Sequence, residues 1–185
     1  MPGVYWLGAV IALIFSIIIN GWLITLCHKK SWFVPAIRPR DEHSTPTPRV
    51  GGIGIVIAFL ITIVLFLIFS NGSLGFGNAT IFGIDRNLVG FLVAIIWLSA
   101  INAIDDYRGL PWQTKLLSQV IAAVIITGFG ILIPTLSNPF GQQIVIGSYS
   151  SFLVIIWLVV ISNVINWLDS IDGVAGGVSS ITLII

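Results

Sequence analysis

Charged residues are scarce in this sequence, and their scarcity decides the class of protein. Lys, Arg, Asp and Glu together make up 8% of the 185 residues, whereas 57% are hydrophobic and the mean hydropathy is +1.08. A water-soluble domain typically carries ~25% charged residues, and so little polar material cannot cover a soluble fold. The composition therefore excludes a soluble globular domain, a disordered segment and a nucleic-acid-binding protein with a basic face. It predicts an integral membrane protein.

Cysteine is also nearly absent, because Cys27 is the only one in the chain. A single cysteine excludes an internal disulfide framework. The net charge of +1 favours neither an acidic nor a basic partner. Aromatic residues, in contrast, are plentiful, with seven Trp and eleven Phe. They suit anchoring at the membrane interface and a surface that faces lipid.

The few charged residues are clustered, and the long charge-free stretches between the clusters predict the membrane spans. A spanning helix needs ~20 mostly apolar residues. We therefore expect an all-α, polytopic transmembrane bundle with the N-terminus outside. Its five complete spans are predicted at 4–27, 50–70, 88–104, 116–136 and 151–168, with a sixth beginning near 174. A turn-rich stretch at 137–141 separates the fourth span from the fifth, and 142–149 could pair as short strands.

The basic residues predict the orientation of these spans. Seven of the eight Lys and Arg fall on one side of the alternating topology, and only Arg86 falls on the other. The positive-inside rule makes the first side cytoplasmic, in a multi-pass protein of the cell inner (plasma) membrane. Six of the seven acidic residues lie on the same side, although this rule hardly constrains acids. A purely topological origin of the pattern stays open as an alternative.

The first cytoplasmic segment, residues 38–52, is basic and rich in proline. Its three prolines after Arg38 prevent a helix, so we expect an extended chain. Arg38, Arg40, His43 and Arg49 lie on it, and the planar arginine fork suits phosphate oxygens. A loop that contacts anionic lipid headgroups is an equally good interpretation.

The second segment joins the third and fourth spans and places two acids beside a lysine. Asp105 and Asp106 end the third span, while Lys115 and Gln119 begin the fourth, one helical turn apart on one face. Such a carboxylate pair suits Mg²⁺, or one carboxylate could accept a proton. Ordinary helix-end charges are the alternative. It is weakened because acids oppose the macrodipole at a helix C-terminus, so a cation should compensate them.

The third segment carries an oxygen-bearing side chain at every third position as the fifth span leaves the membrane. Asn163, Asn166, Asp169 and Asp172 form this series, which makes a slanted stripe if the helix persists. Polar groups within the membrane are costly and usually functional. Hydrogen bonds between helices could explain the two Asn but not the two Asp that continue the register.

These three segments, in this order, resemble the polyprenyl-phosphate N-acetylhexosamine-1-phosphate transferases of glycosyltransferase family 4. The motifs that match are Pro-Thr-Pro-Arg-x-Gly-Gly, Asp-Asp followed by Lys-x-x-x-Gln, and Asn-x-x-Asn-x-x-Asp-x-x-Asp-Gly. The family includes undecaprenyl-phosphate GlcNAc-1-phosphate transferase and phospho-MurNAc-pentapeptide translocase. The first motif is most similar to the branch that initiates O-antigen or similar surface glycans.

The resemblance implies the reaction and its partners. A polyprenyl (undecaprenyl) phosphate in the membrane attacks the β-phosphorus of a UDP-N-acetylhexosamine, and UMP is released with Mg²⁺ as the cofactor. No nucleic acid takes part, and a homodimer is compatible with this assignment. The residues that the resemblance implies are catalytic Asp105, Asp106 and Lys115, metal-binding Asn166 and Asp169, and substrate-binding Asn163, Asp172, His43 and Arg49.

This sequence also differs from the family in two ways. Ser170 stands where the family usually has Gly. Family members continue through further spans with another cytoplasmic Asp and a His-containing loop, so residues 1–185 are expected to be one transmembrane domain, the N-terminal half of a larger one. An inactive fragment of such an enzyme and a non-enzymatic membrane scaffold or transporter module are the alternatives.

Overall fold

The computed structural model describes residues 2–30, 48, 50–69, 79–168 and 173–184, and within them the chain is predominantly helical. A short 3₁₀ turn at Gly147–Tyr149 leads directly into α5. Two hairpins of two-residue antiparallel strands interrupt the helices, β1 (Thr80–Ile81) with β2 (Ile84–Asp85) and β3 (Thr135–Leu136) with β4 (Ile144–Val145). The helices are α1 (Pro2–Lys30), α2 (Gly51–Phe69), α3 (Arg86–Arg108), α4 (Trp112–Gly128), α5 (Ser150–Leu168) and α6 (Val174–Ile184).

The helices confirm the predicted fold class, a polytopic helical membrane protein. Among the described residues, four helical stretches are long and apolar enough to cross a bilayer, namely Trp6–Lys30, Gly51–Phe69, Arg86–Arg108 and Gly147–Leu168. Large apolar side chains such as Ile17, Trp22 and Phe69 are exposed along them. In water such surface would be costly, whereas in a bilayer it faces lipid.

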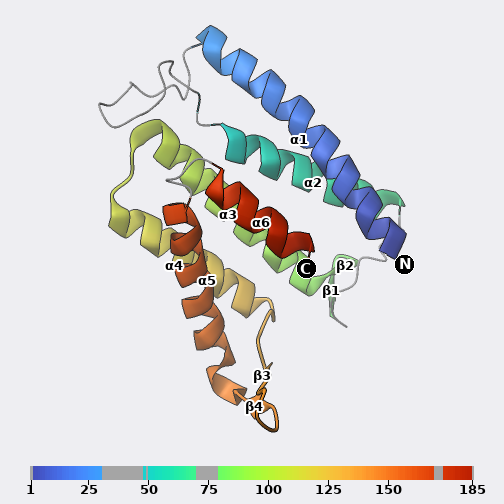
Figure 1. Ribbon diagram of the computed structural model, residues 1–185, viewed down its shortest axis with the longest axis vertical. Helices are drawn as coiled ribbons and strands as arrows, with labels where there is room; N and C mark the ends of the chain where they lie inside the picture. The colour runs from blue at the N-terminus through green and yellow to red at the C-terminus, as the bar shows by residue number, and fades with distance from the viewer. Residues whose placement is uncertain (1, 31–47, 49, 70–78, 169–172, 185) are drawn as a thin grey trace.

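Small residues form the contacts between neighbouring helices. α1 packs on α2, α3 on α4 and α4 on α5, so that chain neighbours are also neighbours in space (Figure 1). The buried positions of α2 are Gly54, Ala58 and Thr62, one turn apart on one face. Small side chains let helix backbones approach closely, which is how helices associate where lipid removes the hydrophobic driving force.

The fourth predicted span is wrong at its C-terminal end. The sequence predicts a helix over 116–136, but α4 ends at Gly128, and its 17 residues make it shorter than the four long apolar stretches. Gly130 adopts a left-handed conformation with φ of 105°, and Pro134 follows four residues later. A left-handed glycine just past the last turn is a common way for a helix to end, and the proline keeps the helix from resuming through 134. The chain then turns into β3, so the strand partner of 144–145 precedes the 137–141 turn rather than lying within 142–149.

The start of α3 is tied to the end of α4. Asp85 is buried and caps α3, because its Oδ1 accepts hydrogen bonds from the backbone N–H groups of Asn87 (2.8 Å) and Leu88 (3.1 Å). Arg86 Nη2 donates to the Gly128 carbonyl at 2.7 Å. We call this end of the bundle, with β1–β4, the hairpin end. The opposite end, where α3 and α5 finish and α4 begins, is the cavity end (Figure 1).

Candidate active site at the ends of three helices

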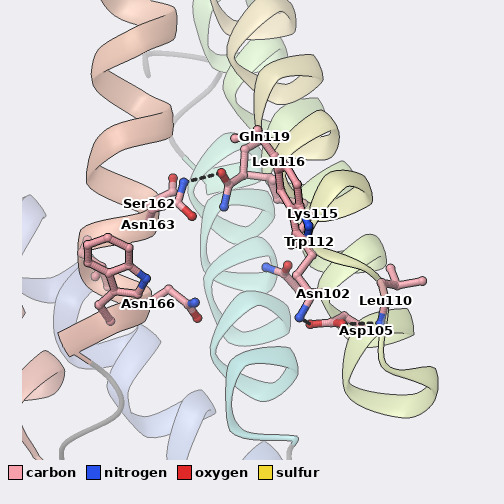
Figure 2. A pocket seen from close by; sticks show the side chains of 13 residues that line it. Asn102, Asp105, Leu110, Trp112, Lys115, Leu116, Gln119, Ser162, Asn163 and Asn166 are labelled. Carbon is pink, nitrogen blue, oxygen red and sulfur yellow. Dashed lines mark hydrogen bonds and ion pairs between the residues drawn. The ribbon is translucent and has the colours of Figure 1, made fainter.

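A cavity of about 750 Å³ opens at the cavity end, between side chains of α3, α4 and α5. Its polar lining comes from residues far apart in the sequence, which Figure 2 shows converging on one space. Apolar and aromatic side chains complete the wall. The lining polar residues are Asn102, Asp105, Lys115, Gln119, Ser162, Asn163 and Asn166.

Asp105 is fixed in place by the way α3 ends. Gly109 takes a left-handed conformation with φ of 70°, and its N–H donates to the Asp105 carbonyl at 2.7 Å. The next residue, Leu110, donates its N–H to Asp105 Oδ1, also at 2.7 Å. A glycine makes this turn without strain, since its φ is costly for residues with a Cβ. The turn thus holds the carboxylate at the cavity wall.

Lys115 supplies for Asp105 the cation that the sequence led us to expect beside the two acids. Its Nζ lies 2.7 Å from Asp105 Oδ2, across the three-residue connection between α3 and α4. The Lys115 side chain is 44% exposed and that of Asp105 is 21% exposed. An ion pair this accessible stabilises a fold by only about 0–1 kcal/mol. The more important effect of this ion pair is to hold an ammonium group and a carboxylate side by side at the cavity.

Asn163 joins α5 to α4 by a hydrogen bond. Its Nδ2 donates to Gln119 Oε1 at 2.7 Å and to the Val159 carbonyl at 2.8 Å (Figure 2). The sequence left open that Asn163 serves only to form a hydrogen bond between helices. The structure shows such a bond for its amide nitrogen. Both residues still line the cavity.

Two further carboxamides face the cavity from opposite sides. Asn166 lies on α5, one turn beyond Ser162, and Asn102 lies on α3, one turn before Asp105 (Figure 2). Neither side chain has a hydrogen-bond partner among the described residues. Each amide offers both a donor and an acceptor to a ligand.

The structure brings together some of the predicted site residues and not others. Asp105, Lys115, Asn163 and Asn166 line the same cavity. Asp106 is exposed on α3, and it is not among the residues that line the cavity. The remaining predictions, His43, Arg49, Asp169 and Asp172, lie outside the described residues.

Asn102 and Gln119 are the lining residues to which the sequence assigned no role. Gln119 shares a helix face with Lys115, as its spacing predicts. Asn102 precedes Asp105 by three residues, so helical spacing could have placed it on the same face. Their place in the site depends on how α3, α4 and α5 pack, which spacing within one helix does not reveal.

The lining residues suit a hard cation that substrate phosphates help to hold. No group of three or more His, Cys, Asp or Glu side chains that could hold a metal ion occurs in the described part of the chain. The cavity offers one carboxylate, Asp105, and the amide oxygens of Asn102 and Asn166. Mg²⁺ accepts such a set, since it is usually bound through one or two carboxylates together with water and substrate phosphates.

Comparison with known proteins identifies relatives over most of the chain. Decaprenyl-phosphate N-acetylglucosaminephosphotransferase of Mycobacterium leprae is 36% identical over 78% of this chain, and that of Mycolicibacterium smegmatis is 32% identical over 92%. Phospho-N-acetylmuramoyl-pentapeptide-transferase of Staphylococcus saprophyticus is 31% identical over 95% of this chain. The chain spans 36%, 41% and 57% of the length of these three relatives, respectively. No solved structure matches the chain.

The sequence profile of glycosyl transferase family 4 matches residues 88–185, just over half of the chain. This region contains α3 from Leu88 onward, all of α4 to α6, and every described residue that lines the cavity. The expectation drawn from the three motifs is therefore confirmed, and the chain belongs to glycosyl transferase family 4.

Proposed function

We propose that this protein transfers N-acetylhexosamine-1-phosphate from a UDP-sugar to a polyprenyl phosphate in the membrane. The reaction forms one P–O bond and breaks another. An oxygen of the lipid phosphate attacks the β-phosphorus of the UDP-sugar, and the bond from that phosphorus to the oxygen bridging it to the α-phosphorus breaks. The products are polyprenyl-diphospho-sugar and UMP, and no oxidant or reductant is needed.

The observation that carries this proposal is the convergence of Asp105, Lys115 and Asn166 on one cavity at the ends of α3, α4 and α5. Of these helices, α3 and α5 are long and apolar enough to cross a bilayer. Phosphoryl transfer needs positioning and neutralisation of charge more than covalent chemistry. The cavity is polar and lies at the end of a bundle whose outer surface faces lipid. A phosphate attached to a lipid and a nucleotide dissolved in water can therefore both reach it. The named relatives, which act on polyprenyl phosphates or belong to the same family, support this reaction class.

Each proposed residue then has a role that its chemistry suits. Lys115 binds phosphate oxygens through its ammonium group. Asp105, and Asp106 beside it, orient or deprotonate the lipid phosphate. Further substrate contacts are proposed for Asn163, Asp172, His43 and Arg49.

Magnesium is the proposed cofactor, held by Asn166 and Asp169 with a contribution from the acids at the end of α3. When bound, it would neutralise negative charge on the diphosphate. Asp105 already accepts hydrogen bonds at both carboxylate oxygens, from Leu110 and Lys115. Its exchange of these partners for a cation would accompany substrate binding.

We further propose that the cavity end faces the cytoplasm from the inner (plasma) membrane, where UDP-sugars are available. Residues 1–185 would form a single transmembrane domain, the N-terminal half of a larger family domain that starts synthesis of a cell-envelope glycan, of the O-antigen type or similar. A homodimer is compatible with this arrangement.

The test is a transfer assay on the complete product of the reading frame that contains these residues. We would reconstitute it in vesicles with polyprenyl phosphate, add radiolabelled UDP-N-acetylhexosamines, and measure UMP and the labelled lipid. Transfer is expected with Mg²⁺, to be lost on chelation with EDTA, and to return when Mg²⁺ is restored. Chelation without effect would contradict the cofactor, and no transfer from any UDP-N-acetylhexosamine would favour an inactive fragment or a scaffold.

A further inference from the structure

The hydrogen bonds of Asn163 determine which way the Gln119 carboxamide points. The Val159 carbonyl can only accept a hydrogen bond, so the atom of Asn163 that faces it at 2.8 Å is the amide nitrogen. The same nitrogen also lies 2.7 Å from Gln119. Gln119 must therefore present its oxygen to Asn163, which leaves the Gln119 nitrogen turned away.

The Gln119 nitrogen is consequently a donor that is oriented and unused. Gln119 Nε2 has no hydrogen-bond partner in the part of the chain that the structure describes, and Figure 2 shows it directed toward the cavity rather than toward Asn163. Its orientation is set before any ligand arrives. A ligand oxygen at this point gains a hydrogen bond without the entropy cost of ordering the side chain.

The depth of Gln119 indicates which ligand it meets. Gln119 lies one turn beyond Lys115 on the same face of α4, about 6 Å farther from the cavity end at 1.5 Å per residue. Apolar Leu98 and Leu116 line the cavity with it. A dissolved nucleotide enters from the aqueous end, whereas a lipid phosphate is held by its chain at the boundary with the hydrocarbon.

We propose that Gln119 binds an oxygen of the polyprenyl phosphate headgroup, with Asn163 as the positioning residue that orients it. The inference rests on the proposed function and assigns one of its two substrates to the inner part of the cavity. Lys115 and Gln119 then form a donor pair along one helix face. Lys115 reaches phosphate oxygens near the aqueous end, and Gln119 reaches those of the lipid phosphate.

Direct binding to the detergent-solubilised protein tests this proposal, with farnesyl phosphate as the lipid probe and UDP-GlcNAc as the nucleotide probe. Gln119→Glu keeps an acceptor for Asn163 and removes the donor, and Gln119→Met removes the donor without adding charge. Losing one hydrogen bond to a charged group should raise the Kd for farnesyl phosphate at least about tenfold in both variants. The Kd for UDP-GlcNAc should change little in Gln119→Met.

Gln113→Glu is the matched control for charge, because Gln113 lies exposed in the first turn of α4 and does not line the cavity. It should bind both probes as the wild type does. Thermal unfolding of each variant separates lost binding from lost folding, and Gln119→Met serves if Gln119→Glu is not recovered folded.

Two results would overturn the assignment. One is wild-type affinity for farnesyl phosphate in Gln119→Met, and the other is an equal loss of affinity for both probes in that variant. Failure of the proposed function is distinguishable from both. In that case the wild type binds farnesyl phosphate and the variants lose it as expected, but no UDP-sugar supports transfer.

Discussion

Asp105 makes three interactions through three different atoms, and together they fix its carboxylate at the cavity wall. Its carbonyl accepts from Gly109, its Oδ1 from Leu110, and its Oδ2 from Lys115. The first two belong to the turn that ends α3, and the third reaches α4. Asp106 is exposed and is not among the residues that line the cavity, so the two acids are not equivalent.

Replacing each acid by its amide tests that difference. Asp105→Asn keeps the size but removes the charge beside Lys115, and we expect the rate of UMP release to fall by about 10²- to 10⁴-fold, as for loss of a catalytic acid or base. Asp106→Asn should reduce the rate less. Assays of the reconstituted full-length protein measure both, with thermal unfolding as a check on folding. A larger loss for Asp106→Asn would reverse the assignment.

At the scale of the helix, the contact between α1 and α2 depends on a glycine. Asn20 lies in this contact, where its Nδ2 donates to the Ser16 carbonyl at 3.0 Å and its buried Oδ1 has no partner in the described structure. A Cβ placed on Gly54 would collide with this carboxamide. Only a glycine lets the two helices approach so closely at this point.

Gly54→Ala should therefore destabilise the bundle by about 1–3 kcal/mol, the usual cost of overpacking. The control is Gly52→Ala, two residues earlier in α2, where a Cβ would meet nothing within 4 Å. That change should be neutral or stabilising, because Ala favours helix over Gly. Thermal unfolding in detergent measures all variants. The double variant Asn20→Ala/Gly54→Ala should recover part of the loss, and a full loss in it would contradict this origin.

The sequence predicted most helices to within a few residues, and its main error shows what limited it. Hydropathy continues through 129–136, so the apolar pattern alone extended the fourth span to Leu136. What ends α4 is the local backbone conformation that follows Gly128, with Gly130 left-handed. Hydropathy averaged over a stretch of sequence hides the effect of a single residue such as Gly130. Where an apolar run met a charged residue, as at Leu168 before Asp169, the end was predicted closely.

At the scale of the whole molecule, the bundle has two unlike ends. The cavity end carries Asp105 and Lys115, and the hairpin end carries Asp85, buried as a helix cap, and Arg86, bonded to Gly128. Asp106 and Arg108 also lie at the end of α3, so among the described residues of α3 and α4 the cavity end holds more charged side chains than the hairpin end, in agreement with the charge distribution from which the orientation was predicted. The orientation itself stays a prediction.

Labelling with a membrane-impermeant maleimide tests the orientation. Cys27 is buried, so Cys27→Ala gives a cysteine-free background. Gln113→Cys places a thiol at the cavity end and Gln142→Cys places one beside the β3–β4 hairpin, both at exposed positions. Reagent added to intact cells should label the second variant, and the first only after the membrane is permeabilised. Labelling of both from outside would contradict the predicted topology.

The candidate site was predictable in part, for a reason that follows from geometry. The family resemblance singled out Asp105, Lys115 and Asn166, and all three line the cavity, whereas their roles stay predictions. The bond from Asn163 to Gln119 depends on how α5 is rotated against α4, which no spacing within one helix specifies. The sequence did not identify Asn102 as a residue of the cavity, because that depends on which residues of the neighbouring helices lie opposite it.

The ion pair between Lys115 and Asp105 bears on the order in which ligands can enter the cavity. With nothing bound, the charges of Lys115 and Asp105 neutralise each other. A phosphate or a cation that binds alone must break this ion pair and leave one of the two side chains without a counterion. If the proposed magnesium and phosphate ligands arrive together, one pairing would be exchanged for two, since Lys115 would pair with the anion and Asp105 with the cation. We therefore expect these two ligands to bind cooperatively.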